Sequence, residues 1–138
     1  MRKIKIIASE FNVEITKQLT SEANVYLDNN GYENTQTIWV PGAFEIPLMC
    51  QRELDDVDAI IALGTVIKGE TEHFEYVCQG VTNGIMQVML EKNKPIGFGI
   101  LMTNNIREAR QRAKKGESNK GYTTAKTIDR LLHNNKNG

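Results

Sequence analysis

The sequence has few cysteines, no long apolar run and no excess of either charge, and each absence excludes a class of protein. Its two cysteines, Cys50 and Cys78, lie in apolar helical stretches without a CxxC pair, so we expect buried, reduced thiols and not a disulfide framework. No apolar segment approaches the ~20 residues of a membrane span. The basic start, residues 1–3, leads into too few apolar residues for a signal peptide. The sequence therefore predicts a soluble, cytoplasmic protein.

The charge balance excludes further classes of protein, and the length sets the number of domains. The 17 Lys and Arg residues balance the 17 Asp and Glu residues, whereas general binding to nucleic acids or anionic membranes needs a basic excess. We therefore expect neither a nucleic acid nor a membrane as a partner. The 138 residues correspond in size to one domain. We predict a single domain over residues 1–138, with a frayed polar tail at 133–138.

Strand-like and helix-like segments alternate along the chain. Runs rich in β-branched residues predict strands, and apolar residues at helical spacing predict helices. The predicted strands cover residues 3–8, 35–40, 57–63 and 95–102, and the predicted helices cover residues 13–30, 43–54, 71–92, 104–115 and 120–133. Such alternation is typical of an α/β fold. We therefore predict a three-layer αβα sandwich with a four-stranded, parallel, flavodoxin-like sheet.

The connection between the third strand and the long third helix is a candidate anion site. Ligands of parallel sheets lie beyond the carboxyl ends of the strands, and this connection carries Gly69, Glu70 and Thr71. We predict a loop over 64–70 and a helix capped by Thr71. The first N–H groups of a helix have no internal partner and can bind phosphate. A capped helix without a ligand is the alternative, and the segment lacks the GxxxxGK[ST] pattern of a P-loop.

His73 is the candidate for proton transfer. It falls in the predicted first turn of the third helix, outside the apolar stripe that starts at Phe74. The positive end of the helix dipole favours a neutral imidazole, which can accept or donate protons. A surface histidine without a function fits the same position. No His, Cys or acidic residues have metal-ligand spacing, so we predict no metal site.

Arg112 and Phe11 are candidates for ligand binding. Arg112 lies in the basic run 107–115, and Glu108, one turn earlier, is placed to pair with it. The alternative to a solvated charged face is a guanidinium directed at a phosphate. Phe11 follows the first strand, where its ring could either stack on a flat ligand or fill the core.

Four segments together resemble the motifs of one family. They are WVPGAFEIP at 39–47, LGTVIKGET with EHF at 63–74, FGIL at 98–101 and NKG at 119–121. The family is lumazine synthase, and the resemblance runs from about residue 4 to residue 132. Three positions depart from the family pattern. Glu10 stands where arginine is frequent, Gln111 stands where glutamate is common, and residues 115–118 replace a K-x-G pattern.

The resemblance implies a cofactor-independent transferase of riboflavin biosynthesis. Its reaction condenses 5-amino-6-(D-ribitylamino)uracil with 3,4-dihydroxy-2-butanone 4-phosphate to give 6,7-dimethyl-8-ribityllumazine, phosphate and water. For the pyrimidine substrate, the implied roles are ring stacking by Phe11, ribityl binding by Ala43 and Glu45, and pyrimidine recognition by the backbone at Val66 and Ile67 and by Lys120. For the second substrate, the implied role is phosphate binding by Gly69, Glu70 and Thr71, with Arg112 facing them. His73 is implied in proton transfer. Phe98 is expected from a neighbouring subunit.

The resemblance also implies partners. Besides the two small-molecule substrates, we expect further copies of the chain, in a homopentamer or a 60-subunit icosahedral capsid, and riboflavin synthase. No cofactor is expected.

Other functions stay open. An archaeal-type riboflavin synthase has a related fold, but the segment around His73 and the VPGAFEIP segment argue against it. A receiver-like binding module would carry acidic residues after a strand, whereas Asp55, Asp56 and Asp58 precede the third one. An inactive, shell-forming or flavin-binding descendant of the family is the third alternative.

Overall fold

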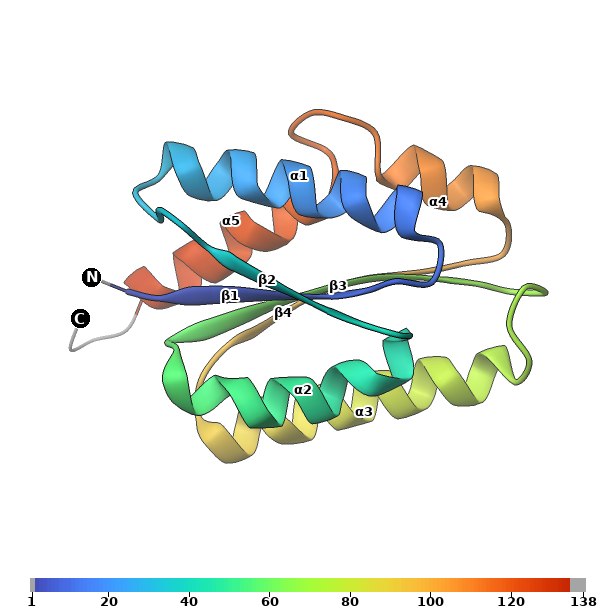
Figure 1. The fold of residues 1–138 in the computed structure, drawn as a ribbon, viewed down its shortest axis with the longest axis horizontal. Coiled ribbons are helices and arrows are strands. Elements are labelled where there is room, and N and C mark those ends of the chain that lie inside the picture. Colours follow the sequence, from blue (N-terminus) through green and yellow to red (C-terminus); the bar gives the residue numbers. More distant parts are fainter. Residues whose placement is uncertain (1, 135–138) are drawn as a thin grey trace.

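The computed structural model describes residues 2–134, which form a sheet between two layers of helices (Figure 1). The elements are β1 (Ile4–Ser9), α1 (Val13–Asn29), β2 (Gln36–Val40), the 3-10 turn η1 (Ala43–Glu45), α2 (Ile46–Glu53), the 3-10 turn η2 (Leu54–Asp56), β3 (Ala59–Ile67), α3 (Phe74–Lys92), β4 (Ile96–Thr103), α4 (Ile106–Arg112) and α5 (Lys120–His133). The four strands are all parallel, in the order β2-β1-β3-β4. The predicted α/β sandwich is confirmed.

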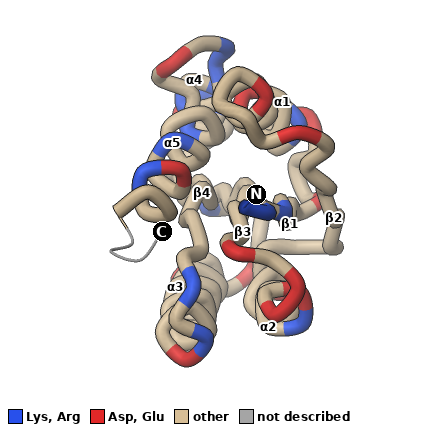
Figure 2. The backbone as a smooth tube through the Cα atoms, turned by 90° about the vertical axis from the view of Figure 1, so that its left-hand side faces the viewer, with Lys and Arg blue, Asp and Glu red and all other residues tan. Residues whose placement is uncertain are grey.

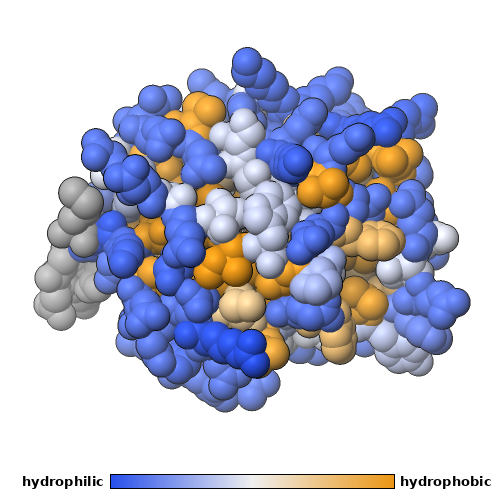
Figure 3. Space-filling view, in the orientation of Figure 1, coloured by the Kyte–Doolittle hydropathy of each residue, from blue (hydrophilic) through white to orange (hydrophobic). Residues whose placement is uncertain are grey.

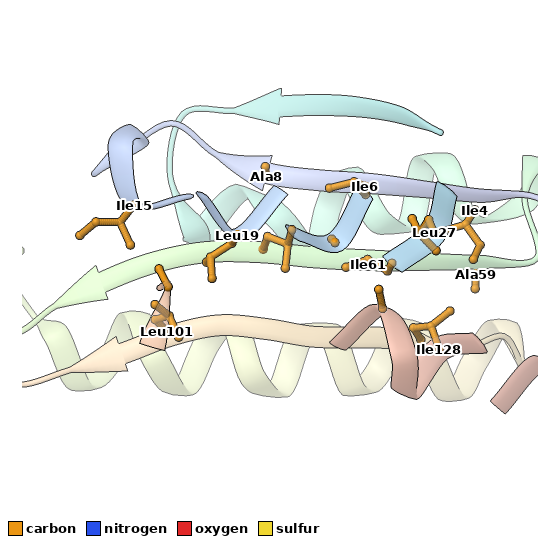
Figure 4. Close-up of a cluster of buried hydrophobic side chains, with 14 of the residues drawn as sticks. Ile4, Ile6, Ala8, Ile15, Leu19, Leu27, Ala59, Ile61, Leu101 and Ile128 are labelled. Carbon is orange, nitrogen blue, oxygen red and sulfur yellow. The ribbon is translucent and has the colours of Figure 1, made fainter. Parts of the chain in front are cut away.

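Each face of the sheet has its own helix layer. Helices α1, α4 and α5 cover one face, and α2 and α3 cover the other (Figure 2). Strand β3 is buried at all nine positions, as expected for a central strand covered on both sides. Its side chains alternate between the layers: Ile61 (Figure 4) and Leu63 join the core under α1 and α5, and Ile60 and Ala62 join the core under α2 and α3.

Helix α1 follows directly from its apolar spacing. Ile15, Leu19, Ala23 and Leu27 are at most 6% exposed and face the sheet (Figure 4). Gly31 ends the helix with φ at +88°, a conformation that costs glycine little. This lets Tyr32 N donate to Leu27 O at 3.0 Å, which satisfies a terminal carbonyl. The predicted stop at Gly31 is confirmed.

Several predicted boundaries are wrong. The predicted loop over 64–70 starts too early, because β3 stays paired with β4 up to Ile67↔Thr103 and the buried neighbour strand holds Gly64 and Thr65 extended. The predicted helix 43–54 begins and ends as a 3-10 turn. The predicted helix 104–115 is shorter, because Asn105 caps it through a hydrogen bond from Glu108 N at 2.9 Å and α4 ends at Arg112.

The two cysteines differ in burial. Cys50 is buried, and this burial raises its pKa to about 12. Cys78 is only half-buried, so the prediction that both are buried is wrong for Cys78; both are free thiols.

Of the predicted tail 133–138, His133 ends α5 and residues 135–138 lie outside the described residues. Within residues 2–134, no helix combines the length and apolar composition needed to span a bilayer.

Candidate active site

Three loops follow the carboxyl ends of β1, β2 and β3, which lie at the same edge of the sheet (Figure 1). They comprise residues 10–12, 41–45 and 68–73. The first two are joined directly, since Glu10 N donates to Val40 O at 2.8 Å. The carboxyl ends of parallel strands are where ligands of such sheets bind. This edge is therefore the expected position of a site.

Phe11 lies at the tip of the first loop. Its side chain is 47% exposed, so the alternative that it fills the core is wrong. Asn12 follows in the left-handed conformation, with φ at 57°, and its carbonyl accepts hydrogen bonds from Ile15 N and Thr16 N. This abrupt start of α1 leaves the Phe11 ring open to solvent, where it can stack on a flat ligand.

The carboxylate of Glu45 is held by its own loop. Gly42 N donates to Glu45 Oε1 at 2.9 Å, and Glu45 N donates to Gly42 O at 3.2 Å. Ala43, between them, is buried at 6% exposure, whereas Glu45 is exposed. A carboxylate whose first oxygen is fixed by an amide still has a second oxygen to accept hydroxyl hydrogen bonds. Glu45 therefore keeps one carboxylate oxygen free at this edge of the sheet.

Strand β3 extends past the end of β1. The last pair between β1 and β3 is Ala8↔Leu63, whereas β3 and β4 stay paired to Ile67↔Thr103. Ile60 N and Lys68 N both donate toward β4, to Pro95 O and Thr103 O. Because backbone groups alternate in direction along a strand, those of Thr65 and Ile67 face the side without a strand neighbour. Of the two residues whose backbone was predicted to recognise a pyrimidine, Ile67 lies on this open edge, whereas the backbone of Val66 faces β4.

His73 occupies a different position from the predicted one. It is the N-cap residue of α3, in the left-handed conformation with φ at 59°, and not a residue of the first turn. Thr71 does not cap the helix, and no side-chain hydrogen bond caps it. His73 is exposed, and its carbonyl accepts from Val77 N at 3.0 Å. The imidazole therefore stands just before the helix, beside amide groups that no side chain satisfies.

The predicted phosphate loop immediately precedes His73. Gly69 has φ at +89°, which favours glycine, and Glu70 N donates to Ile67 O at 3.2 Å. Gly69 and Glu70 are exposed and Thr71 is half-buried. Lys68 Nζ lies 3.8 Å from a carboxylate oxygen of Glu75, an exposed pair of small energetic value. The loop leaves backbone groups and a hydroxyl at the surface, next to the imidazole.

The remaining predicted residues lie elsewhere in the chain. Phe98 is half-buried on β4, an edge strand, and packs against the core under α2 and α3. Lys120 is the first residue of α5 and is exposed. Arg112 is the last residue of α4, which runs back from the carboxyl edge (Figure 1). The structure thus gathers one set of predicted residues at the carboxyl edge and places a second set apart from it.

Two expectations for Arg112 are wrong within one chain. Its helix, α4, packs on the opposite face of the sheet from α3, and no ion pair among residues 2–134 joins it to the 68–73 loop. The expected pair with Glu108 does not form either. The Glu108 carboxylate accepts instead from Asn104 N and Asn105 Nδ2, each at 3.3 Å, because it is drawn into the start of α4.

Tyr76 is a site residue that the sequence analysis missed. Its ring is 73% exposed and its centroid lies 6.0 Å from that of His73. His73 directly precedes α3 and Tyr76 lies in its first turn, so both stand at the same end of the helix, and their closeness was visible in the segment 73–76. An exposed aromatic ring beside an exposed imidazole adds an apolar wall to the carboxyl edge.

Comparison with known proteins agrees with this arrangement. The family model described as 6,7-dimethyl-8-ribityllumazine synthase matches residues 1–136. Proteins of that name from Limosilactobacillus reuteri (43% identical, over 97% of this chain and 90% of the relative) and Pediococcus pentosaceus (48%, over 89% and 81%) are similar to it. So is that of Desulfovibrio desulfuricans, 42% identical over 89% of this chain and 81% of the relative. The chain belongs to the 6,7-dimethyl-8-ribityllumazine synthase family.

Proposed function

We propose that this protein condenses 5-amino-6-(D-ribitylamino)uracil with 3,4-dihydroxy-2-butanone 4-phosphate, giving 6,7-dimethyl-8-ribityllumazine, phosphate and water. The observation that carries the proposal is the common position of four features. An exposed aromatic ring (Phe11), a fixed carboxylate (Glu45), the open edge of β3 and an exposed imidazole (His73) all lie at the carboxyl edge of the sheet. Membership of the family supports the same reaction.

The pyrimidine substrate would lie across this edge. Phe11 would stack on its ring, and the backbone groups of Thr65 and Ile67, which face away from β4, would pair with its polar edge. The ribityl chain would extend over Ala43 toward the Glu45 carboxylate. The phosphate of the second substrate would lie at the loop of Gly69, Glu70 and Thr71, where amide donors and the start of a helix favour an anion.

The chemistry requires orientation and proton transfer. The pyrimidine amine forms an imine with the ketone and water leaves, phosphate is then eliminated, and the second ring closes with loss of another water. Both substrates are intrinsically reactive, so holding them together supplies much of the rate enhancement. His73, next to the phosphate loop, would carry protons to and from the reacting groups.

A second copy of the chain completes the site in this proposal. Phe98, Arg112 and Lys120 lie away from the carboxyl edge of their own chain, so a neighbouring subunit would supply them. Head-to-tail contacts of this kind close into rings, and we propose a cytoplasmic homopentamer, or a 60-subunit icosahedral capsid built from pentamers. Riboflavin synthase, which would use the product, is the proposed protein partner.

The surface offers apolar area for such contacts. Phe44, Leu48 and Leu90, on the side of α2 and α3, are 61%, 51% and 69% exposed. Apolar side chains also reach the surface between α1 and α2 (Figure 3), where β2, with half-buried Ile38 and Trp39, forms an edge of the sheet. Exposed apolar residues gathered in this way are typical of interaction surfaces.

The test is direct. The purified protein is mixed with both substrates, and formation of the fluorescent lumazine is followed over time. Light scattering on the same sample gives the number of subunits. Product formation by an assembly of five or sixty subunits supports the proposal. Failure to form product from fresh substrates overturns the enzymatic function and favours an inactive, shell-forming or flavin-binding descendant.

A further inference from the structure

The segment between α4 and α5 is held in place by hydrogen bonds to two buried side chains, Asn119 and Glu22. This connector, residues 113–119, separates Arg112 at the end of α4 from Lys120 at the start of α5. Both cations are exposed, and the proposed function assigns both to substrate binding. The direction in which they point therefore depends on how the connector is held.

Asn119 ties the two ends of the connector together. Its side chain is fully buried, and Nδ2 donates to Ala113 O at 2.8 Å while Oδ1 accepts from Gly121 N at 2.7 Å and Tyr122 N at 3.3 Å. One amide thus satisfies the last turn of α4 and the first turn of α5. This explains why Asn119 is buried although it is polar.

The start of α5 packs directly against the backbone of helix α1. A Cβ at Gly121 would overlap with Leu19 O, so only glycine permits this approach of the two backbones. Asn119 Nδ2 also lies 3.5 Å from Gln18 O. The first turn of α5, and with it Lys120, is therefore placed by the backbone of α1.

Glu22 holds the middle of the connector. It lies on α1, is 7% exposed, and accepts a hydrogen bond from Gly116 N at 2.8 Å. Gly116 has φ at +124° and nothing within 4 Å of an added Cβ, so the position requires glycine for its conformation and not for space. Burying a carboxylate is unfavourable unless it is hydrogen-bonded, and bonds from an amide to a charged acceptor are strong.

We infer that Glu22 is a positioning residue for Arg112 and Lys120. It touches neither substrate. By fixing Gly116 to α1 it fixes the curvature of the connector, and thereby the direction of the two cations at its ends. This inference rests on the proposed function, because it concerns the binding of the same two substrates.

The test measures kcat and KM for each substrate in Glu22→Ala and Glu22→Gln. We expect Glu22→Ala to raise both KM values roughly fivefold or more, because the hydrogen bond that holds Gly116 is lost. The kcat should stay within about twofold, because His73 lies on a different element. Glu22→Gln should return both KM values to within about twofold of the wild type, since its amide oxygen can accept the same bond.

Two further variants separate positioning from general stability. Asp28→Ala removes an exposed carboxylate from the same helix and should leave both KM values unchanged. Gly116→Ala disturbs the same hydrogen bond from the connector side, without a steric clash, and should raise the same KM values even if Glu22→Ala does not fold.

The outcomes are distinguishable. If the wild type forms lumazine but Glu22→Ala and Gly116→Ala keep normal KM values, or if Glu22→Gln is as impaired as Glu22→Ala, the positioning role is overturned while the proposed function stands. If the wild type forms no lumazine, the proposed function fails, and the positioning role fails with it.

Discussion

Gly64 lies so close to Ser9 that a Cβ at position 64 would stand 2.7 Å from the Ser9 hydroxyl oxygen. Ser9 is fully buried, and its hydroxyl has no hydrogen-bond partner within residues 2–134. We therefore expect Gly64→Ala to lower the free energy of unfolding by about 1–3 kcal/mol. Ser9→Ala should be neutral or stabilising, because it removes an unsatisfied polar group. In the double variant, Ser9→Ala should remove most of the cost.

Urea unfolding of the four proteins measures this coupling between Gly64 and Ser9. Gly97→Ala is the matched control: its Cβ would meet Thr124 and Ile128, on the other face of the sheet from Ser9. Its cost should add to the effect of Ser9→Ala without coupling. Additive effects at Gly64 and Ser9 would show that the close approach is not the cause.

Asp129 links α5 to α1 and predicts a dependence of stability on acid pH. Its carboxylate accepts from Tyr26 at 2.6 Å and Tyr32 at 2.5 Å. Burial raises the pKa of Asp129, but the hydrogen bonds from the two tyrosines and the nearby His133 outweigh it, so the pKa lies below its usual value. Such a carboxyl stabilises the fold above its unfolded pKa of about 4, and this stabilisation is lost as pH falls through the lower, folded pKa.

We therefore expect Asp129→Asn to lower the free energy of unfolding by about 2 kcal/mol at pH 7. The difference from the wild type should shrink as the pH is lowered below 4, in urea unfolding followed by circular dichroism. Asp56→Asn, at an exposed position, is the control and should have little effect. A difference that does not change with pH would argue against the titration of Asp129 as its cause.

The contact between Tyr26 and Asp129 also predicts a loss of stability at alkaline pH. Burial and the hydrogen bond to Asp129 raise the pKa of Tyr26 to about 12. A raised pKa stabilises the fold below the unfolded value of about 10, and the stabilisation is lost as the pH rises through the folded value. We expect the wild type to lose more stability between pH 10 and 12 than Tyr26→Phe does. Parallel curves for the two proteins would contradict this.

His73→Ala should reduce kcat by about 100-fold or more, because the imidazole would be lost as a proton carrier. The KM of either substrate should change much less. The protein has one other histidine, His133, at the far end of α5, and His133→Ala should retain the wild-type kcat. Steady-state kinetics over a range of pH checks this, and an equal loss in both variants would remove His73 from the reaction.

A site shared between chains predicts complementation. Arg112→Ala and His73→Ala should each be nearly inactive alone. If each site takes His73 from one chain and Arg112 from its neighbour, equal amounts unfolded and refolded together leave about one quarter of the sites intact. We expect roughly a quarter of the wild-type activity after mixing. No recovery, in assemblies shown to contain both chains, would place both residues in the same chain.

The sheet and its helices were predictable because apolar spacing decides them. The apolar runs of β1 and β3 match a strand, and the apolar stripe of α1 matches a helix. The residues that are buried in the structure follow the same spacing. The end of β3 was not predictable in this way. Gly64 favours a loop by residue type, and pairing with β4, a contact distant in sequence, keeps it extended.

The position of the candidate site at the carboxyl edge of the sheet was predictable, but its geometry was less so. Phe11 and Glu45 are exposed at the expected edge. The local sequence favoured Thr71 as the helix cap, yet the path of the loop places His73 there in a left-handed conformation that residue preferences do not indicate. The role of Glu22 depends on its contact with Gly116, 94 residues away, and no local pattern encodes such a contact.

The alternation of β3 side chains between the two cores has a consequence for how the protein opens. Ile61 and Leu63 anchor one helix layer, and Ile60 and Ala62 anchor the other. Neither layer can detach without exposing one side of this strand to water. Amide hydrogen exchange at residues 60–63, where β3 is paired with a strand on each side, should therefore proceed only through global unfolding, so that both layers come apart in a single cooperative event.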